Sequence, residues 1–426
     1  MSAASDRSHE VTIAASPDRP ATAPLRGLTV LDMSTSYAGP TASMYLADLG
    51  ADVVKVERPG TGDDARYWGP PFASGASAWF ASANRNKRSI AVDVGTAGGR
   101  QVLHRLIDRA DVFIENLNPA KLERLGLAPA DTLARRPHLV YCAMSGLGLT
   151  GPDAHLPGYD LVAQARSGLM SVTGPAGGAP QRVSTALSDI VTGMSAALAV
   201  CAAVVRQRTT GVGDLVDVSL LDSDLALMAP RLAAYLAGDP EPAPSGGTDS
   251  VLALYQSFPT ADRDVVIAVG NDVLWQRFCA AVGLPGLAVD DRLRDNAGRR
   301  AHRDELVATV CGVLRGRPAA HWLDVLQRAG VPAALVQGLS EVVRDPQVVA
   351  RQAILPVPGS GGALHGVRSP FRLGSLPEPR NERFPDLGEH TLEVLAECGF
   401  TDEEVGQLLD GAAVEAPRQP AGQVTR

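Results

Sequence analysis

Two aspartates at the starts of helix-like segments are the residues of this chain best placed to act chemically on a small molecule. Asp160 follows the turn residues Gly158 and Tyr159, and Asp189 precedes a long apolar run. An aspartate at a helix start is ordinarily a cap that contributes about 1 kcal/mol. Capping and an active-site role therefore both remain open for each aspartate. Tyr159 is a third acid/base candidate beside Asp160.

A glycine pattern near these aspartates matches the sequence motif of a dinucleotide-binding loop. Gly146, Gly148 and Gly151 have the required spacing and follow an apolar strand-like run. Such a loop must lead directly into a helix whose N-terminus meets the pyrophosphate. Here Pro152 and Pro157 follow instead, so the pattern favours turn glycines over nicotinamide binding.

Basic residues gather at the ends of expected strands, where open α/β sheets bind ligands. They are Lys55, Arg58, Lys87, Arg88 and Arg124. Each one alone is consistent with a solvated surface charge. As a set they are also consistent with a site for a phosphorylated ligand, and the two readings stay open.

The composition excludes several classes of function. The chain has 426 residues, 45% of them hydrophobic, and a formal net charge of -8, which argues against nucleic-acid binding. Its five cysteines are scattered without metal-ligand or CxxC spacing, which favours reduced thiols, no metal and a cytoplasmic location. We expect no membrane partner, because no apolar run approaches the length of a membrane span, which is about 18 residues.

The alternation of strands and helices predicts a doubly wound α/β fold with a parallel sheet. The expected strands are 28–33, 52–57, 88–93, 111–115, 139–143, 213–219, 251–257, 264–269 and 331–336. The expected helices are 41–49, 98–109, 186–208, 220–236, 272–282, 302–315, 318–329, 389–398 and 402–410. The predicted organisation is a disordered extension (1–23), a large domain (24–225), a linker with a Gly-rich gate (226–250), a small domain (251–340), a return to the large domain (341–411) and a flexible tail (412–426).

A series of short motifs then carries a resemblance to a known family. They are Leu28–Met33, Ala38–Pro40, Leu49–Pro59, Asn86–Ile90, Ala110–Asn116, Leu122–Gly126, Gly158–Leu161, Ser167–Met170, Asp217–Leu221 and Leu387–Thr391. In this order they resemble the class III CoA-transferase family (CaiB/BaiF type), which also contains the α-methylacyl-CoA racemases. The resemblance covers about residues 25 to 410.

The resemblance implies a Rossmann-like large domain built from both chain ends, a smaller α/β domain and an interlocked homodimer. It also implies acyl-CoA thioesters and carboxylates as substrates, with no tightly bound cofactor and no metal. By position, the CoA site would include Tyr37, Ala38, Arg58, Val92, Asp93, Asn116, Leu117 and Arg124. The Gly-rich gate would include Gly246 and Gly247.

The chain departs from both chemical patterns of the family. Typical transferases carry Thr-Gly-x-x-Asp-Gly-x-Pro, whose Asp attacks the thioester to give a mixed anhydride. Here Thr173–Pro180 has the same length, and Gly177 stands at the Asp position. In racemases the first motif reads Gly-His-Asp, whereas Tyr159 replaces the His here. The racemase Asp position is kept as Asp189. The racemase carboxylate of the second domain would fall near Val273 and is absent.

Three hypotheses follow. The first is an acyl-CoA:carboxylate CoA-transferase in which Asp160 or Asp189 substitutes for the nucleophile, or in which the acceptor carboxylate attacks the thioester directly. The second is a racemase, isomerase or other non-transfer enzyme acting on a thioester, with Asp189 and Tyr159 or Asp160 as acid/base groups. The third is a catalytically idle member of the family that binds a ligand or a partner subunit.

Overall fold

The computed structural model describes residues 23–417 apart from 74–75, 360–361, 375 and 377–380. The chain divides into two compact units. Unit 1 comprises Met1–Ser167, Ser184–Met228 and Gln352–Arg426, and unit 2 comprises Gly168–Val183 and Ala229–Arg351. Most of the expected extension and tail lies outside the described residues.

Unit 1 is built on a seven-stranded sheet with the order β14-β5-β2-β1-β6-β7-β8. The strands are β1 Thr29–Asp32, β2 Asp52–Glu57, β5 Arg88–Val92, β6 Val112–Glu115, β7 Val140–Ser145, β8 Asp214–Ser219 and β14 Val414–Glu415. Six strands are parallel, and β14 pairs antiparallel with β5. The expected α/β fold with a mostly parallel sheet is confirmed, although a free tail from residue 412 is wrong because β14 completes the sheet edge.

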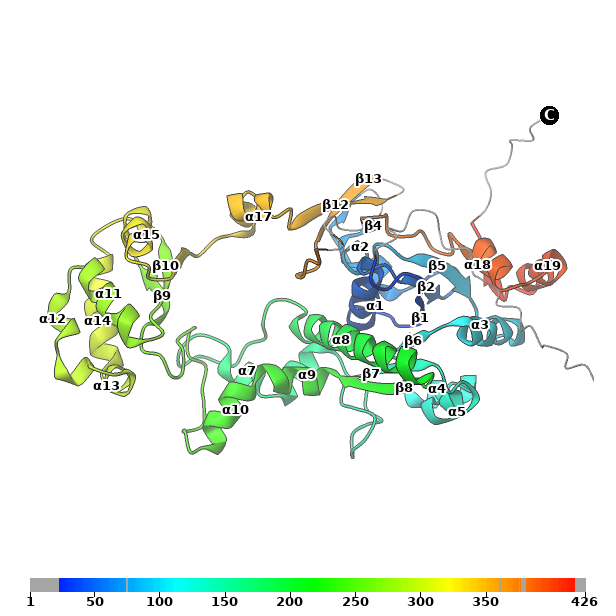
Figure 1. Cartoon of the computed structure of the whole chain (residues 1–426), viewed down its shortest axis with the longest axis horizontal. Helices are drawn as coiled ribbons and strands as arrows, with labels where there is room; N and C mark the ends of the chain where they lie inside the picture. Colours follow the sequence, from blue (N-terminus) through cyan, green and yellow to red (C-terminus); the bar gives the residue numbers. More distant parts are fainter. Residues whose placement is uncertain (1–22, 74–75, 360–361, 375, 377–380, 418–426) are drawn as a thin grey trace, which may run out of the picture. The chain divides into compact units, whose positions relative to one another are not determined.

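Both faces of the sheet are covered, which explains why its strands are continuous apolar runs. Alternate residues point to opposite faces: Val30 and Val53 face one side, whereas Leu31 and Val54 face the other. Helices α1 (Ala38–Asp48) and α8 (Leu187–Thr210) cover the first face. Helices α3 (Ala97–Arg109), α18 (Thr391–Glu397) and α19 (Asp402–Asp410) cover the second (Figure 1).

Helix α8 has 24 residues and is long and apolar enough to cross a membrane by length and composition alone, with a mean hydropathy of 1.8 over its most apolar 18 residues. The sequence expectation that no segment has this character is therefore wrong. Ala196, Val200 and Val204 on one face of the helix are packed in the core. A core helix passes the same composition test, so the finding assigns no membrane role. The opposite face leaves Leu198 and Val205 exposed.

Several short elements of unit 1 were not expected from the sequence. They are η1 Asp64–Tyr67, β3 Phe72–Ala73, β4 Ala76–Ser77, α2 Ala78–Asn84, α4 Pro119–Leu125, α5 Pro129–Arg135, β12 Ile354–Gly359 and β13 Gly362–Val367. Helix α6 (Asp160–Arg166) begins at the expected aspartate. The expected helix 220–236 is two helices, α9 Leu220–Leu227 and α10 Ala229–Leu236. The break precedes Pro230, which has no backbone N–H to donate to the preceding turn of helix.

Unit 2 contains a three-stranded antiparallel sheet in the order β11-β10-β9 (β11 Ala333–Leu335, β10 Asp264–Ala268, β9 Tyr255–Pro259). Its helices are α7 Leu169–Val172, α10, α11 Asp272–Ala281, α12 Pro285–Ala288, α13 Asn296–Ala301, α14 Arg303–Leu314, α15 Ala319–Arg328, α16 Leu339–Val342 and α17 Pro346–Ala350, with a 3-10 turn η2 Asp291–Leu293. The strand expected at 251–257 starts later, at Tyr255. The Asp249 carboxylate accepts hydrogen bonds from the backbone N–H groups of Val251 and Leu252 and holds this stretch in a turn.

Candidate functional site

The point at which strand order reverses lies between β1 and β6, and open α/β sheets bind ligands there. The loops that follow these two strands are joined by a pair of hydrogen bonds. The Asn116 side chain accepts from the Thr35 backbone N–H (3.0 Å) and donates to the Thr35 carbonyl oxygen (2.9 Å). Asn116 therefore fixes the β1–α1 loop across the mouth of the crevice.

Asp32, the last residue of β1, is completely buried beneath this loop. Its carboxylate accepts hydrogen bonds from the Ser34 backbone N–H, the Ser43 hydroxyl and the Lys87 ammonium, the last at 3.1 Å. Burial opposes ionisation of Asp32, but Lys87 and Lys55 outweigh it and hold the pKa below its usual range. Burial lowers the pKa of Lys87 to about 8, with Asp32 acting in the opposite direction.

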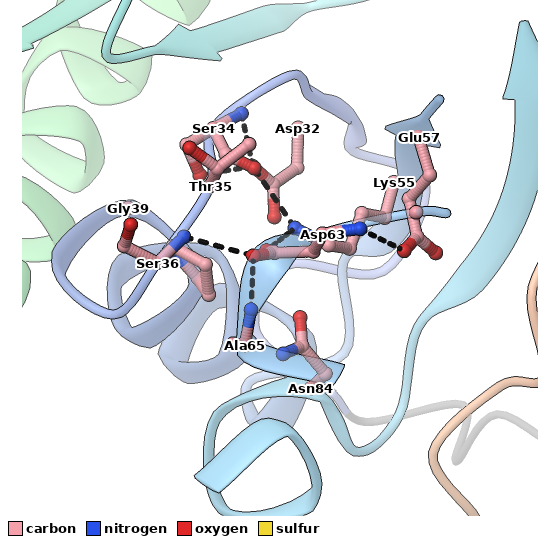
Figure 2. Close-up of polar contacts among 12 residues, drawn as sticks. Asp32, Ser34, Thr35, Ser36, Gly39, Lys55, Glu57, Asp63, Ala65 and Asn84 are labelled. Carbon is pink, nitrogen blue, oxygen red and sulfur yellow. Dashed lines mark hydrogen bonds and ion pairs between the residues drawn. The ribbon is translucent and has the colours of Figure 1, made fainter. Parts of the chain in front are cut away.

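Lys55 of β2 and Asp63 form the second half of this buried network (Figure 2). The Lys55 ammonium lies 2.9 Å from Asp63 Oδ2 and donates to the Ser34 carbonyl oxygen at 2.8 Å. Asp63 Oδ1 accepts from the backbone N–H groups of Ser36 and Ala65, both at 3.0 Å. The pair thus holds the β1–α1 loop and the η1 turn against each other, and Ser36 adopts a left-handed φ of 72° within this loop.

Glu57, at the end of β2, continues the network toward β5. It accepts hydrogen bonds from Arg66 Nε and Nη2, both at 2.7 Å, and from the Ser89 hydroxyl at 2.6 Å. Burial raises the pKa of Glu57, but the Arg66 contacts and Lys55 prevail and hold it below its usual range.

A cavity of about 150 Å³ opens above this network at the carboxyl ends of the strands. Its lining includes Thr35, Lys55, Arg58, Asp63, Val92, Val94, Leu117 and Lys121. Among the cations of this region, Arg58 and Lys121 line the cavity, and Arg124 lies close to Lys121. Burial, together with repulsion from Arg58 and Arg124, lowers the pKa of Lys121, which indicates that the three positive charges are close together. Such crowding is suited to a ligand with several negative charges.

Glu115, at the end of β6, is a buried carboxyl beside this region. It accepts from the Leu117 backbone N–H at 2.7 Å and from the Tyr141 hydroxyl at 3.4 Å. Burial raises the pKa of Glu115 to about 7. Glu115 therefore anchors the loop that places Leu117 in the cavity wall.

Only some of the residues expected at the CoA site line the cavity. Arg58, Val92 and Leu117 line the cavity, and Arg124 lies close to its rim residue Lys121. Asn116 holds the β1–α1 loop through its hydrogen bond with Thr35. Asp93 is exposed, and its carboxylate accepts a hydrogen bond from Gly95 N–H in the turn before α3. Tyr37 is the last non-helical residue before α1, and Ala38 is its first helical residue and is buried.

Of the two interpretations left open for the five basic residues, a single phosphate site does not include Lys87 or Arg88, and Lys55 lines the cavity as an already paired cation. Lys55 and Lys87 are buried and paired within the network. Arg88 begins β5 and so lies at the amino edge, paired with Asp52 and Glu393. Lys121 was missed, although its spacing of three residues from Arg124 on one helix is a signal that sequence reasoning offers.

The candidate catalytic aspartates both lie in unit 1: Asp160 begins α6, and Asp189 lies in the first turn of α8. Asp160 accepts from the Ser188 backbone N–H (2.9 Å) and from Gln164 Nε2 (2.6 Å), so its carboxylate caps α8. Burial, and then the Asp160 and Asp224 carboxylates, raise the pKa of Asp189 to about 7. Tyr159 is 68% exposed.

The Gly177 loop belongs to unit 2, where it packs against the expected gate. The Gly246 N–H donates to the Gly174 carbonyl oxygen at 2.9 Å, and Gly246 and Gly247 both have left-handed φ values. Gly177 also has a left-handed φ, of 68°, and a Cβ added there would meet no atom within 4 Å. The loop therefore has room for a side chain that this sequence lacks.

Over the described parts of the chain, no group of three or more His, Cys, Asp or Glu side chains is arranged to hold a metal ion. The electrostatics of the crevice are instead those of a buried ion network below and clustered cations above. That arrangement suits an anionic organic ligand.

Comparison with known proteins identifies the class. CoA-transferase family III matches residues 25–391. A mouse succinyl-CoA:glutarate CoA-transferase is 37% identical over 92% of this chain and 90% of its own length. An acetyl-CoA:oxalate CoA-transferase of Acetobacter aceti is 36% identical over 83% and 92%, respectively.

A crystal structure of a CaiB/BaiF family protein from Brucella suis superposes with a TM-score of 0.77. It is 36% identical, and the match covers 88% of this chain and 99% of that one. The chain belongs to CoA-transferase family III, so the resemblance seen in the sequence is confirmed. The family assignment supports an enzyme of the CoA-transferase class, for which CoA thioesters are substrates.

The raised pKa of Asp189 predicts a specific dependence of stability on pH. Between its ordinary value of 3.8 and about 7, the folded protein holds the Asp189 proton more tightly than the unfolded chain does. This contribution therefore falls as pH rises through that window. Asp189→Asn should raise the free energy of unfolding at pH 8 by up to about 4 kcal/mol, and the gain should vanish near pH 4.

Urea unfolding of both proteins at pH 4 and pH 8 measures the difference. Asp131→Asn, on exposed helix α5, is the matched control for loss of a carboxylate. A gain of equal size at both pH values would contradict the assigned cause.

Proposed function

We propose that the protein is an acyl-CoA:carboxylate CoA-transferase with a non-standard active site. The observation that carries the proposal is the cavity at the strand-order reversal, in a chain of CoA-transferase family III. Lys121 and Arg58, which is paired with Asp64, line this cavity, and Arg124 lies close to Lys121. Clustered cations suit the phosphate groups of CoA. The named relatives transfer CoA between carboxylic acids, which supports the same reaction type here.

Gly177 cannot supply the carboxylate of the usual covalent route, so the acceptor acid itself is the proposed nucleophile. Its carboxylate oxygen attacks the thioester carbonyl carbon, the C–S bond breaks, and CoA thiolate and a mixed anhydride result. The thiolate then attacks the acceptor carbonyl carbon of the anhydride, and the C–O bond breaks to release the donor carboxylate. No net proton is gained or lost.

Asp189 is the better of the two aspartates for an auxiliary role. Asp160 is engaged in capping α8, and using it as a nucleophile would remove that cap. Asp189 has a pKa of about 7, close to the value that favours general acid/base catalysis at neutral pH.

The raised pKa of Asp189 also favours a second candidate function, proton exchange at the α-carbon of an acyl-CoA. In that reaction a base removes the α-hydrogen, and a proton returns on either face. Incubation in D₂O with a chiral 2-methylacyl-CoA tests this function directly. Absence of deuterium at the α-carbon, in a preparation that exchanges CoA between acids, removes the alternative.

We further propose a homodimer in which a second copy covers the exposed face of α8. A cleft of about 1210 Å³ within unit 1 is lined by apolar residues of α8 and by Leu25, Leu49 and Phe371. Leu198 is 74% exposed and Val205 66% exposed on this face. An exposed apolar patch of this kind marks an interaction surface. The five free cysteines support a cytoplasmic location as part of the same proposal.

Restoring a carboxylate at position 177 should enhance transfer. Gly177→Asp has open space around its Cβ and requires a left-handed backbone, which Asp and Asn both tolerate. We expect the rate of CoA exchange between succinyl-CoA and a panel of carboxylic acids to rise about tenfold, a change of about 1.4 kcal/mol in the barrier. Mass spectrometry should detect CoA thioester at residue 177.

Gly177→Asn is the matched control because it has the same shape without a nucleophilic carboxylate. Equal rates for the two variants would exclude the loop as the site of the transfer chemistry. A wild-type protein inactive across the whole panel, with an Asp variant that is also inactive, would favour the catalytically idle hypothesis.

Removing the Lys121 cation should weaken substrate binding without slowing the chemistry. In Lys121→Ala the KM for the CoA thioester should rise about tenfold with kcat unchanged, as expected for a charge contact made equally in ground and transition states. Lys121→Arg keeps the charge and should stay within about twofold of wild type. An unchanged KM in the Ala variant would remove Lys121 from the binding site.

The proposed dimer predicts that a charge on the exposed face of α8 shifts the oligomeric state. Leu198→Glu should sediment as a monomer at concentrations where the wild type sediments as a dimer, because a buried carboxylate at the interface lacks a partner. Leu236→Glu changes a leucine that is 82% exposed and lies outside the cleft, so it should not alter sedimentation. A monomeric wild type would overturn the proposal.

A further inference from the structure

A deeply buried carboxyl group at the strand-order reversal differs from the other buried carboxyl groups of the crevice. Glu115 is the last residue of β6 and is 1% exposed. Among the described residues no ion pair includes Glu115, whereas Asp32 and Asp63 are each paired with a lysine. Burying a carboxylate without a countercharge is costly, so such a group favours its protonated, neutral form.

The hydrogen-bond geometry around Glu115 also fits a protonated carboxyl group. The Leu117 backbone N–H donates to Oε2 at 2.7 Å. The Tyr141 hydroxyl lies 3.4 Å from Glu115 Oε1 but 2.9 Å from the Leu127 carbonyl oxygen, and it has one hydrogen to give. The shorter contact takes that hydrogen, because a carbonyl oxygen cannot donate. A proton on Oε1 completes the set, since it gives Glu115 a hydrogen to donate to the Tyr141 oxygen.

The titratable and charged groups on the neighbouring strands do not neutralise Glu115. On β7, burial and then Glu115 itself raise the pKa of Tyr141 and of Cys142. On β1, Asp32 pairs with Ile114, the residue before Glu115, and so faces the opposite side of the sheet. Burial raises the pKa of Glu115 to about 7 against its two hydrogen bonds, and no charged group of the described chain contributes to this shift.

Glu115 is linked to the cavity through Leu117. Leu117 donates to the Glu115 carboxyl group and also lines the cavity, as does the cation Lys121. Two residues of chain span at most about 7 Å, so an anionic ligand in the cavity brings negative charge close to Glu115. Negative charge disfavours ionisation of a carboxyl group. Ligand binding and proton binding at Glu115 therefore favour each other, and this coupling is reciprocal.

We propose that Glu115 is a positioning residue that holds a proton when the cavity is occupied, so that binding of a CoA thioester takes up a proton from solvent. The proton moves from solvent to Glu115 Oε1, and no bond of the ligand changes. Oε2 still accepts from Leu117 N–H in the protonated form, so the cavity wall keeps its place. This inference rests on the proposed function, because it needs an anionic ligand in the cavity. Affinity for the CoA thioester then falls as pH rises through neutrality.

Calorimetric titration of the full-length protein with free CoA at pH 7.5, in phosphate and in Tris, counts the protons taken up on binding. A rise of about one pKa unit on binding, from about 7, corresponds to uptake of about half a proton by Glu115. Glu115→Gln keeps the shape and an acceptor for Leu117 N–H but cannot titrate, so its count should be lower than wild type by that amount. Between pH 6 and pH 8.5, wild-type affinity should fall about sevenfold more than that of the Gln variant.

Glu123→Gln is the matched control, because it removes an exposed carboxylate of α4 and leaves the buried one. It should retain the proton uptake and the pH dependence of wild type. The infrared band of protonated carboxyl groups should also grow when CoA binds to wild type, a measurement that does not depend on folding of the Gln variant. Equal proton uptake in Glu115→Gln and wild type, or an unchanged infrared band, would overturn the inference. Failure of wild type to bind free CoA at any pH would instead refute the proposed function.

Discussion

The buried ion pair between Lys55 and Asp63, joined to Asp32 and Lys87, is the interaction on which the ligand crevice depends. Removing charges from water is costly, and a buried pair adds little stability by itself. This network nevertheless has a structural role, because its charged groups also form hydrogen bonds with the backbone of the β1–α1 loop and of η1. These backbone hydrogen bonds fix the β1–α1 loop and η1 and so offset part of the electrostatic cost. A hydrophobic replacement would fill the space but would leave these backbone groups without partners.

The elements that were predicted well are those specified by local periodicity. Strand β2 and helix α19 have the expected bounds, because a β-branched apolar run and an amphipathic run with a Thr401 cap each carry their own signal. The elements that were missed depend on distant partners. Strand β14 has only two residues and exists because Val414 meets Val92 of β5. The β12–β13 hairpin contains prolines and glycines that read as loop until the pairing is seen.

The candidate site shows the same division. Arg58 was expected at the ligand crevice by the rule that parallel strands present ligand sites at their carboxyl ends, and Val92 and Leu117 were expected there from the family resemblance; all three line the cavity. The sequence does not show burial, so it could not reveal that Lys55 and Lys87 are paired inside the protein. Arg88 was grouped with residues at the carboxyl ends of strands although the expected strand 88–93 begins with it, and the start of β5 lies at the opposite edge of the sheet.

Under the proposed function, binding and chemistry belong to different parts of this fold, and only the chemical group departs from the family pattern. The cavity, its cations and the buried network all lie in unit 1, whereas the loop that carries Gly177 belongs to unit 2. A substitution at Gly177 removes no contact that holds either unit together, because its Cβ position faces open space. Under the proposed function, the missing carboxylate leaves no unfilled space at position 177, and glycine suits the left-handed φ of 68° there. A chain with this sequence can retain the architecture of a CoA-thioester site while its reaction depends on the acceptor acid or on the perturbed Asp189 carboxyl group.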